Sequence, residues 1–312
     1  MTRIVAHLIV GAKQEPFLPA LLASIEPATE HIFVNENSGF RERAPALRAL
    51  QASALFRSGR MTLKHTTFEG FAAARNICLQ LDRGACDDTW IAFIDADEVH
   101  GERFATIARN LARLPKRLSF VDGFTWHFFK SFDWYLAIDR RMMFYRWTPS
   151  VRWDGDVHER LIGVGGARIA LPYVYAHYGH VSPFSEDTRQ GTQYASLGQH
   201  GNALPADIAL DADERGDFSR LNPHFADRWR RLIRFTGEHP PAARPIIVYE
   251  KLRLSEQFRR IEAAIEEHQP RAERFKNFFR RINYAQRWRL RWLQAARYGM
   301  LRSAQATASN ID

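Results

Sequence analysis

The hydrophobic and polar positions in the first third of the chain follow two alternating periods. Apolar runs typical of buried strands cover 3–12, 31–35, 61–66 and 90–94. Apolar residues at helical spacing lie between these runs, most clearly in 15–25 and 70–81. Strands that alternate with helices at this spacing predict a mostly parallel α/β sheet, whose ligands lie outside the carboxyl ends of the strands.

The pattern changes near residue 118. Aromatic-rich strand signals continue to about residue 181, and a helical pattern follows near 184–201. Residues 201–224 are polar and rich in turn formers, which predicts a loop. Three helical segments are expected after it, at 225–236, 245–267 and 270–302. The expected organisation is a domain over 1–200, a polar loop over 201–224 and a helical extension with a basic, aromatic tail over 225–312.

Composition places the chain among globular proteins. With 312 residues, 46% hydrophobic and 25% charged, it can bury one large core or a core with an appendage. No stretch has the roughly 18 to 20 apolar residues of a membrane span, and we see no signal peptide, so we expect a cytoplasmic protein. Its two cysteines, Cys78 and Cys86, are too few for a disulfide framework and lack the spacing of a zinc site.

The apolar run at 90–94 leads directly into three carboxylates, Asp95, Asp97 and Glu98. Residues i and i+2 of an extended segment point the same way, so Asp95 and Asp97 can present two carboxylates to one point beyond the sheet. Hard oxygen ligands of this kind suit Mg²⁺ or Mn²⁺, which complete their coordination with water and substrate phosphates. The alternative is an acidic turn that caps a helix starting near residue 101.

Other motifs accompany this cluster along the chain. They are LIVGAKQEPFLPALLASI, HIFVNENSG and FEGFAAARN before it, and VRWDGDVHERL and YVYAHYGH after it. With D-A-D-E, they resemble the inverting family 2 glycosyltransferases of GT-A fold, in the bacterial branch that carries D-A-D-E and V-H-E motifs. The resemblance covers about residues 3–195. It implies a mixed α/β sheet flanked by helices, to which the C-terminal helices are an extension.

The resemblance also implies a sugar nucleotide bound across the carboxyl edge of the strands. Asp97 would bind a metal ion that bridges both phosphates and stabilises the departing diphosphate, and Asp95 would reach the ribose or a metal-bound water. Glu15, in the turn after the first strand, and Asn35, at the end of the second, occupy donor-binding positions. Arg75 either approaches the pyrophosphate or holds the acidic loop in place.

An inverting transfer also needs a base that deprotonates the acceptor hydroxyl from the face opposite the diphosphate. Glu159 is our first candidate for this base. Asp156 is the second, and in an extended segment the two would face opposite ways. For a further metal ligand we favour His177, followed by His158.

One position departs from the family pattern. The family usually has an aspartate at the end of the second strand, where this chain has Asn35 followed by Glu36. An amide can still donate to and accept from a base edge. The departure leaves UDP, GDP and dTDP open as donor nucleotides and favours to some degree an altered or inactive enzyme.

The positive charge of the chain is concentrated near its C-terminus. Residues 271–302 carry ten Lys and Arg against one acidic residue, interleaved with aromatic residues. This segment is either a helix packed on the core, a helix lying on anionic lipid at the inner face of the membrane, or, as the least favoured choice, a nucleic-acid-binding element.

The leading hypothesis is a metal-dependent glycosyltransferase that uses a nucleoside-diphosphate sugar and a glycan or lipid-linked acceptor of the cell envelope. The alternatives are a Mg²⁺-dependent phosphohydrolase and a non-enzymatic lipid- or RNA-binding protein.

Overall fold

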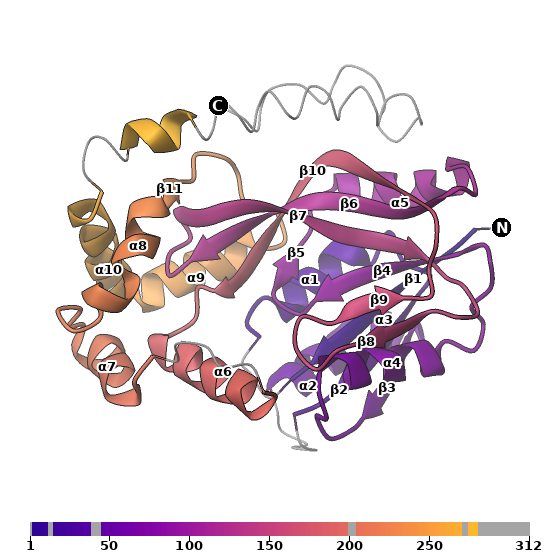
Figure 1. Cartoon of the computed structure of the whole chain (residues 1–312), viewed down its shortest axis with the longest axis horizontal. Coiled ribbons are helices and arrows are strands. Elements are labelled where there is room, and N and C mark those ends of the chain that lie inside the picture. Colours follow the sequence, from indigo (N-terminus) through magenta and orange to yellow (C-terminus); the bar gives the residue numbers. More distant parts are fainter. Residues whose placement is uncertain (1, 12–14, 39–44, 199–203, 270–273, 280–312) are drawn as a thin grey trace.

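The computed structural model describes residues 2–11, 15–38, 45–198, 204–269 and 274–279. Within them, nine strands form one mixed sheet in the order β3-β2-β1-β4-β7-β6-β10-β5, with β11 paired to β7 (Figure 1). The strands are β1 Arg3–Val10, β2 His31–Glu36, β3 Met61–His65, β4 Thr89–Asp95, β5 Glu98–Val99, β6 Leu118–Phe129, β7 Trp134–Arg146, β10 Ala167–His180 and β11 Ile233–Arg234. Strands β1 to β4 are mutually parallel, and β7 is antiparallel to both β4 and β6. The predicted mixed α/β sheet is therefore confirmed.

Helices cover both faces of the parallel half of the sheet. They are α1 Leu18–Ile25, α2 Pro45–Ala52, α3 Ala54–Arg57, α4 Phe71–Leu81 and α5 Arg103–Asn110, which continues into a 3-10 turn, Leu111–Arg113. Because successive strand residues point to opposite faces, Ala6 and Leu8 pack with α1 and α5, whereas Val5 and Ile91 pack with α4. This two-sided burial explains why the strands are nearly continuous apolar runs.

The later strands bring distant motifs to the end of β4. The short β5 pairs antiparallel with β10, so that His177 lies opposite Glu98. On its other side β10 pairs parallel with β6, which puts His127 opposite His177. Two further strands, β8 Arg152–Asp154 and β9 Arg160–Ile162, form a separate hairpin whose loop carries residues 155–159.

The part of the chain after β10 is helical. Its elements are α6 Phe184–Ser196, α7 Ala206–Leu210, a π-helical turn Asp211–Arg215, α8 Asn222–Arg231, α9 Arg244–Arg253 and α10 Ser255–Glu267. The predicted C-terminal helices are confirmed as far as residue 267. A further helical stretch covers 274–279, and the rest of the predicted helix at 270–302 lies outside the described residues.

The prediction of a polar loop over 201–224 is wrong for most of its described part. Residues 206–215 are helical, because Ile208, Ala209 and Ala212 pack into an apolar cluster with Phe184 and Trp229. In addition, Asp213 accepts hydrogen bonds from the backbone N–H groups of Phe184 and its neighbour Ser185, which joins this turn to the start of α6. The apolar residues are too few and too interspersed with charge to show a helical period.

Two other boundaries differ from expectation. The helix expected over 225–236 ends at Arg231, where the chain enters β11 beside β7. The helix expected over 245–267 is divided into α9 and α10 at Leu254. Among the described residues, no helix combines the length and apolar character required to cross a membrane.

Candidate active site

The acidic cluster forms the turn between β4 and β5, at the carboxyl edge of the parallel strands. Asp95 is clamped between two arginines: its Oδ1 accepts from Arg75 Nη2 at 2.6 Å and its Oδ2 from Arg141 Nη2 at 2.9 Å. Burial alone would raise the pKa of Asp95, but these two positive charges outweigh it and lower the pKa. Asp95 is therefore ionised and held in one orientation at neutral pH.

Glu98 is buried and contacts the backbone of Asp95. Its Oε2 accepts from the Asp95 backbone N–H at 3.1 Å, and its Oε1 is 3.5 Å from Arg141 Nη1. Burial and the neighbouring charge of Asp95 raise the pKa of Glu98 to about 7. The third carboxylate of the motif is thus a support for the turn and for Arg141.

Arg75 connects the acidic turn to the β8–β9 hairpin. This buried α4 residue donates from Nη2 to Asp95 and from Nε to Glu159 Oε1, while its guanidinium carbon lies 4.1 Å from the centre of the Phe93 ring. The guanidinium is planar and always charged, so one side chain can hold two carboxylates in fixed positions. Arg75 therefore contacts both the acidic turn and Glu159, so that one guanidinium connects the two segments.

The two candidate bases occupy different surroundings in the hairpin loop. Glu159 is turned inward to Arg75, and its side chain is 11% exposed. Asp156 is exposed, and its backbone carbonyl accepts from Phe71 N–H at the start of α4. The structure therefore brings Glu159, but not the Asp156 carboxylate, into the network around Asp95.

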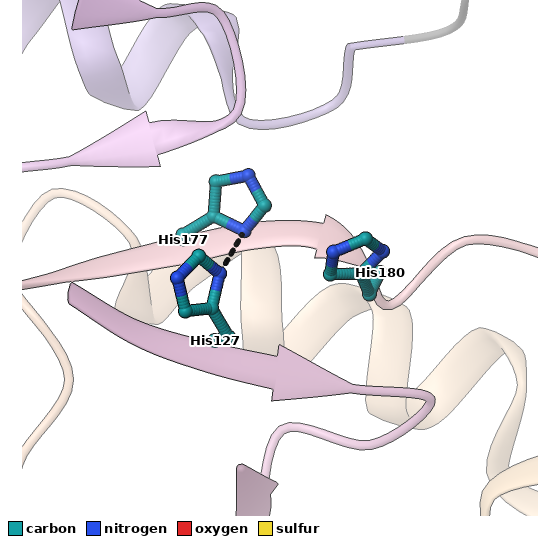
Figure 2. A group of neighbouring side chains, drawn as sticks. All are labelled: His127, His177 and His180. Atoms are coloured by element: carbon teal, nitrogen blue, oxygen red, sulfur yellow. Dashed lines mark hydrogen bonds between the residues drawn. The ribbon is translucent and has the colours of Figure 1, made fainter. Parts of the chain in front are cut away.

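A group of three histidines lies next to Asp97. His177 Nε2 is 3.2 Å from Asp97 Oδ1, and His177 Nδ1 is 3.3 Å from His127 Nδ1. His180 completes the group: one ring nitrogen from each histidine lies within 4.8 Å of the others (Figure 2). His177 was expected near the acidic turn, whereas His127 and His180 were not anticipated.

The pKa of His177 is shifted in the opposite direction from the pKa values of the other two histidines. Burial lowers the pKa of His127 and of His180 to about 3, so both imidazoles are neutral. Burial also disfavours the charged form of His177, but the Asp97 carboxylate outweighs it and raises the pKa. The group therefore contains two neutral imidazoles, His127 and His180, and a third imidazole whose charged form is favoured by the Asp97 carboxylate.

A glycine makes the Asp97–His177 contact possible. A Cβ atom at Gly179 would lie 2.2 Å from Asp97 Oδ2 and 2.9 Å from His177 Cε1. Both distances are shorter than a side chain can tolerate, so the two groups can approach each other only where residue 179 has no side chain.

His158, the second metal candidate, lies elsewhere. It is an exposed residue of the β8–β9 loop with a positive φ of 55°, and its ring centre lies 6.4 Å from that of Tyr194 on α6. It is not part of the histidine group.

Asn35 is the penultimate residue of β2, and its side-chain amide forms hydrogen bonds inside the protein. Its Nδ2 donates to the Ala74 carbonyl at 3.0 Å, and its Oδ1 accepts from Thr66 Oγ1 at 2.9 Å. Asn35 is fully buried. Glu15 lies just before α1, where its backbone carbonyl accepts from Leu18 N–H. Residues 12–14 and 39–44, which flank these positions, lie outside the described residues.

Sequence reasoning missed Arg141, His127 and His180. Arg141 and His127 stand on long aromatic-rich strands outside the motifs, and only the pairing of β6, β7 and β10 places them near Asp95 or Asp97. His180 is the last residue of the motif YVYAHYGH, from which only His177 was selected. A signal was available for His180, since it follows His177 by three residues, in A-H-Y-G-H.

Comparison with known proteins assigns the family. Residues 9–167, slightly more than half of the chain, match the model of Glycosyl transferase family 2. No curated protein matches the sequence. Similar solved structures include S. aureus TarS 1-349, at 11% identity and a TM-score of 0.32 over 95% of this chain and 92% of that chain. Another is GalNAc-T7 with UDP, GalNAc and Mn²⁺, at 11% identity and a TM-score of 0.37 over 73% of this chain and 54% of that chain.

The matched residues contain the main parts of the network described above. They include β4 with its acidic turn, Arg75 on α4 and Glu159 in the hairpin loop. The chain belongs to glycosyl transferase family 2.

Proposed function

We propose that the protein is a metal-dependent inverting glycosyltransferase, which moves a sugar from a nucleoside-diphosphate sugar to a hydroxyl group of a glycan or glycolipid. The observation that carries the proposal is the Arg75 bridge. One guanidinium holds Asp95, at the carboxyl edge of the sheet, and Glu159, on the hairpin loop. A donor-binding carboxylate and a candidate base therefore border the same space. Family membership supports glycosyl transfer over the phosphohydrolase and the non-enzymatic lipid- or RNA-binding protein considered from the sequence.

Asp97 is the residue that would hold a divalent ion. Its carboxylate lies 3.2 Å from His177 Nε2, and Gly179 leaves the space that this approach requires. The Asp97 carboxylate is a hard oxygen ligand that suits Mn²⁺ or Mg²⁺, and donor phosphates and water would complete the coordination. A bound ion would neutralise charge that develops on the departing diphosphate.

Glu159 is the proposed base. In an inverting transfer, the acceptor oxygen attacks the anomeric carbon as the bond to the diphosphate breaks, and the base takes the hydroxyl proton. Arg75 fixes the Glu159 carboxylate in position, so that less reorganisation is needed when the acceptor binds. Asp156 is the less suitable candidate because its carboxylate is exposed at the surface of the loop.

Asn35 is proposed to affect donor binding indirectly, by holding the segments that border the donor site in position. Because both polar groups of its side chain are satisfied by Ala74 and Thr66, it holds the end of β2 against α4 and the segment after β3. UDP, GDP and dTDP all stay candidate donors on this basis. Glu15, before α1, is kept as a donor-binding candidate at the same edge of the sheet.

Replacing the two candidate bases separately tests this assignment. Glu159→Gln should lower the turnover number by orders of magnitude with little change in donor affinity, because the amide cannot accept the proton. Asp156→Asn is the matched control in the same loop and should retain most activity. Equal activity of Glu159→Gln and the wild type would remove Glu159 from the chemistry, and a loss only in Asp156→Asn would transfer the role.

The acceptor is proposed to be a glycan or lipid-linked intermediate of the cell envelope, met by a peripheral protein at the cytoplasmic face of the membrane. Support comes from the helical stretch 274–279, where Phe275, Phe278 and Phe279 are exposed next to Arg274 and Lys276. Aromatic and basic residues on one helix favour anionic lipid surfaces.

Deletion of residues 270–312 tests the membrane contact, because it removes the exposed phenylalanines of 274–279 and leaves the sheet and its helices in place. Binding to vesicles with anionic lipid should fall while nucleotide binding persists. Undiminished vesicle binding would refute a role of the tail in membrane contact, and binding of RNA in place of vesicles would favour the nucleic-acid alternative.

A further inference from the structure

His127, His177 and His180 present ring nitrogens to a common point. The three residues come from two neighbouring strands, His127 from β6 and the other two from β10, and the strand register sets His127 directly beside His177. The Nδ1 atoms of these two rings are 3.3 Å apart, and a nitrogen of His180 lies within 4.8 Å of the others (Figure 2). Two nitrogens bound to one ion at about 2.1 Å in tetrahedral geometry are separated by about 3.4 Å. The first pair therefore already has the spacing of two ligands.

The second nitrogens of two of these rings face carboxylates. His177 Nε2 lies 3.2 Å from Asp97 Oδ1, and His127 Nε2 lies 3.4 Å from Asp139 Oδ2. A histidine that binds a metal through one nitrogen commonly donates its other N–H to a carboxylate, which fixes the tautomer and the ring orientation. This arrangement is independent of the spacing between the rings, and it points to the same ligand atoms, Nδ1 of His127 and Nδ1 of His177.

We propose that His127, His177 and His180 form a site for a transition-metal ion such as Zn²⁺, distinct from the ion proposed at Asp97. Imidazole nitrogens suit Zn²⁺, Co²⁺ and Ni²⁺, whereas Mg²⁺ requires oxygen ligands. The two sites lie on opposite sides of the His177 ring, because Nδ1 faces the histidines and Nε2 faces Asp97. One ring does not have to serve two ions, since Asp97 can hold its own ion with donor phosphates and water.

The site also has a consequence for the transferase reaction, and this part rests on the function proposed above. An ion on His177 Nδ1 leaves the proton on Nε2, from which it is donated to Asp97 Oδ1. The Asp97 carboxylate is then held in one orientation for the donor ion. His127, His177 and His180 are positioning residues in this scheme, because they act through Asp97.

Titration of the metal-free full-length chain with Zn²⁺ and Co²⁺, without nucleotide, tests the site. Calorimetry with Zn²⁺ should give one ion per chain, and Co²⁺ should produce a visible ligand-field spectrum. Millimolar Mg²⁺ should not displace either ion. His127→Ala and His180→Ala should each weaken binding by at least about tenfold. His224→Ala, which removes an exposed histidine of α8, should bind like the wild type.

The variants also separate this site from the donor site. Asp97→Asn should still bind Zn²⁺ without nucleotide, because its amide oxygen can accept from His177, but it should lose metal-dependent nucleotide binding. Thermal melts verify that each variant is folded, and His127→Gln replaces His127→Ala if the latter is not.

Absence of stoichiometric Zn²⁺ binding by the wild type, or equal affinity in the folded histidine variants, would overturn the three-histidine site while leaving the proposed donor site intact. Zn²⁺ binding that depends on all three histidines, in a protein without nucleotide binding, would support the site and refute the proposed function.

Discussion

Replacement of Arg75 by methionine is expected to destabilise the protein as well as the site. Arg75 is a buried residue whose guanidinium contacts Asp95 and Glu159, and neither carboxylate side chain is more than 23% exposed. Removing one partner of a buried ion pair costs roughly 3 to 5 kcal/mol, because a charge is left uncompensated. Asp95 keeps Arg141 at 2.9 Å, so the lower end, about 3 kcal/mol, applies.

The expected loss can be measured by thermal unfolding. A change of about 3 kcal/mol lowers the melting temperature of a chain of this size by roughly 4 to 5 °C. Arg109→Met, on the exposed side of α5, is the control and should stay within about 0.5 kcal/mol of the wild type. The double variant Arg75→Met/Glu159→Gln should recover part of the stability, since the amide removes the unpaired charge.

The effect of Arg75→Met should also depend on pH. Arg75 and Arg141 lower the pKa of Asp95 against the opposing effect of burial. The stabilisation from a lowered carboxyl pKa is complete above the unfolded value and is lost as the pH falls through the folded value. The difference between wild type and Arg75→Met should therefore be largest near neutral pH and shrink in acid. A difference under about 1 kcal/mol at pH 7, or no coupling in the double variant, would refute this account of the Arg75 network.

Three further predictions follow from single contacts. Gly179→Ala should displace Asp97 and abolish metal-dependent nucleotide binding in calorimetry. The control Gly165→Ala, whose added Cβ would meet no atom within 4 Å, should bind like the wild type. Normal binding by Gly179→Ala would show that binding does not require Asp97 in its observed position. The pKa of Glu98 is raised to about 7, so this carboxyl group binds more protons in the folded state than in the unfolded state. The wild type should therefore lose stability relative to Glu98→Gln as the pH rises from about 4.5 through 7. A pH-independent stability difference between the two proteins in urea unfolding would contradict this prediction. Lys130→Met should lower the free energy of unfolding by about 3 kcal/mol in the same assay, because the buried ammonium pairs with Asp187 and donates to the Ser182 carbonyl at 2.7 Å. A loss below about 1 kcal/mol would mean that these contacts contribute little to stability.

The sequence predicts the fold more completely than the site. The apolar runs identify β1 to β4 because these strands are buried on both faces, and the helices between them have clear apolar faces. The mixed α/β sheet and the glycosyltransferase family expected from the motifs are confirmed. In contrast, the sequence predicts a loop where residues 206–215 are helical. The helical structure of this segment depends on tertiary contacts of a few small apolar residues such as Ala209 and Ala212, which give no helical period in the sequence.

Within the site, local motifs identify only what lies within one segment. Asp95 and Asp97 can be recognised from their position after an apolar strand. The pairing of Arg75 with Glu159, the role of Arg141 and the approach of His127 to His177 depend on the register of β6, β7 and β10, which periodicity alone does not reveal. Asn35 was recognised as a departure, but only the structure shows that its amide is engaged by Ala74 and Thr66.

The central claim is a donor site for a nucleoside diphosphate that depends on a metal ion at Asp97. The most direct test is a thermal-shift titration with UDP, GDP, dTDP and CMP, each with and without Mn²⁺, on wild type and Asp97→Ala. A ligand at about 100 times its dissociation constant adds about 2.7 kcal/mol of stability. The account predicts that one diphosphate stabilises the wild type only with Mn²⁺ and has no effect on Asp97→Ala. Stabilisation of both proteins to the same extent, or of neither by any nucleotide despite cooperative melting, would contradict it.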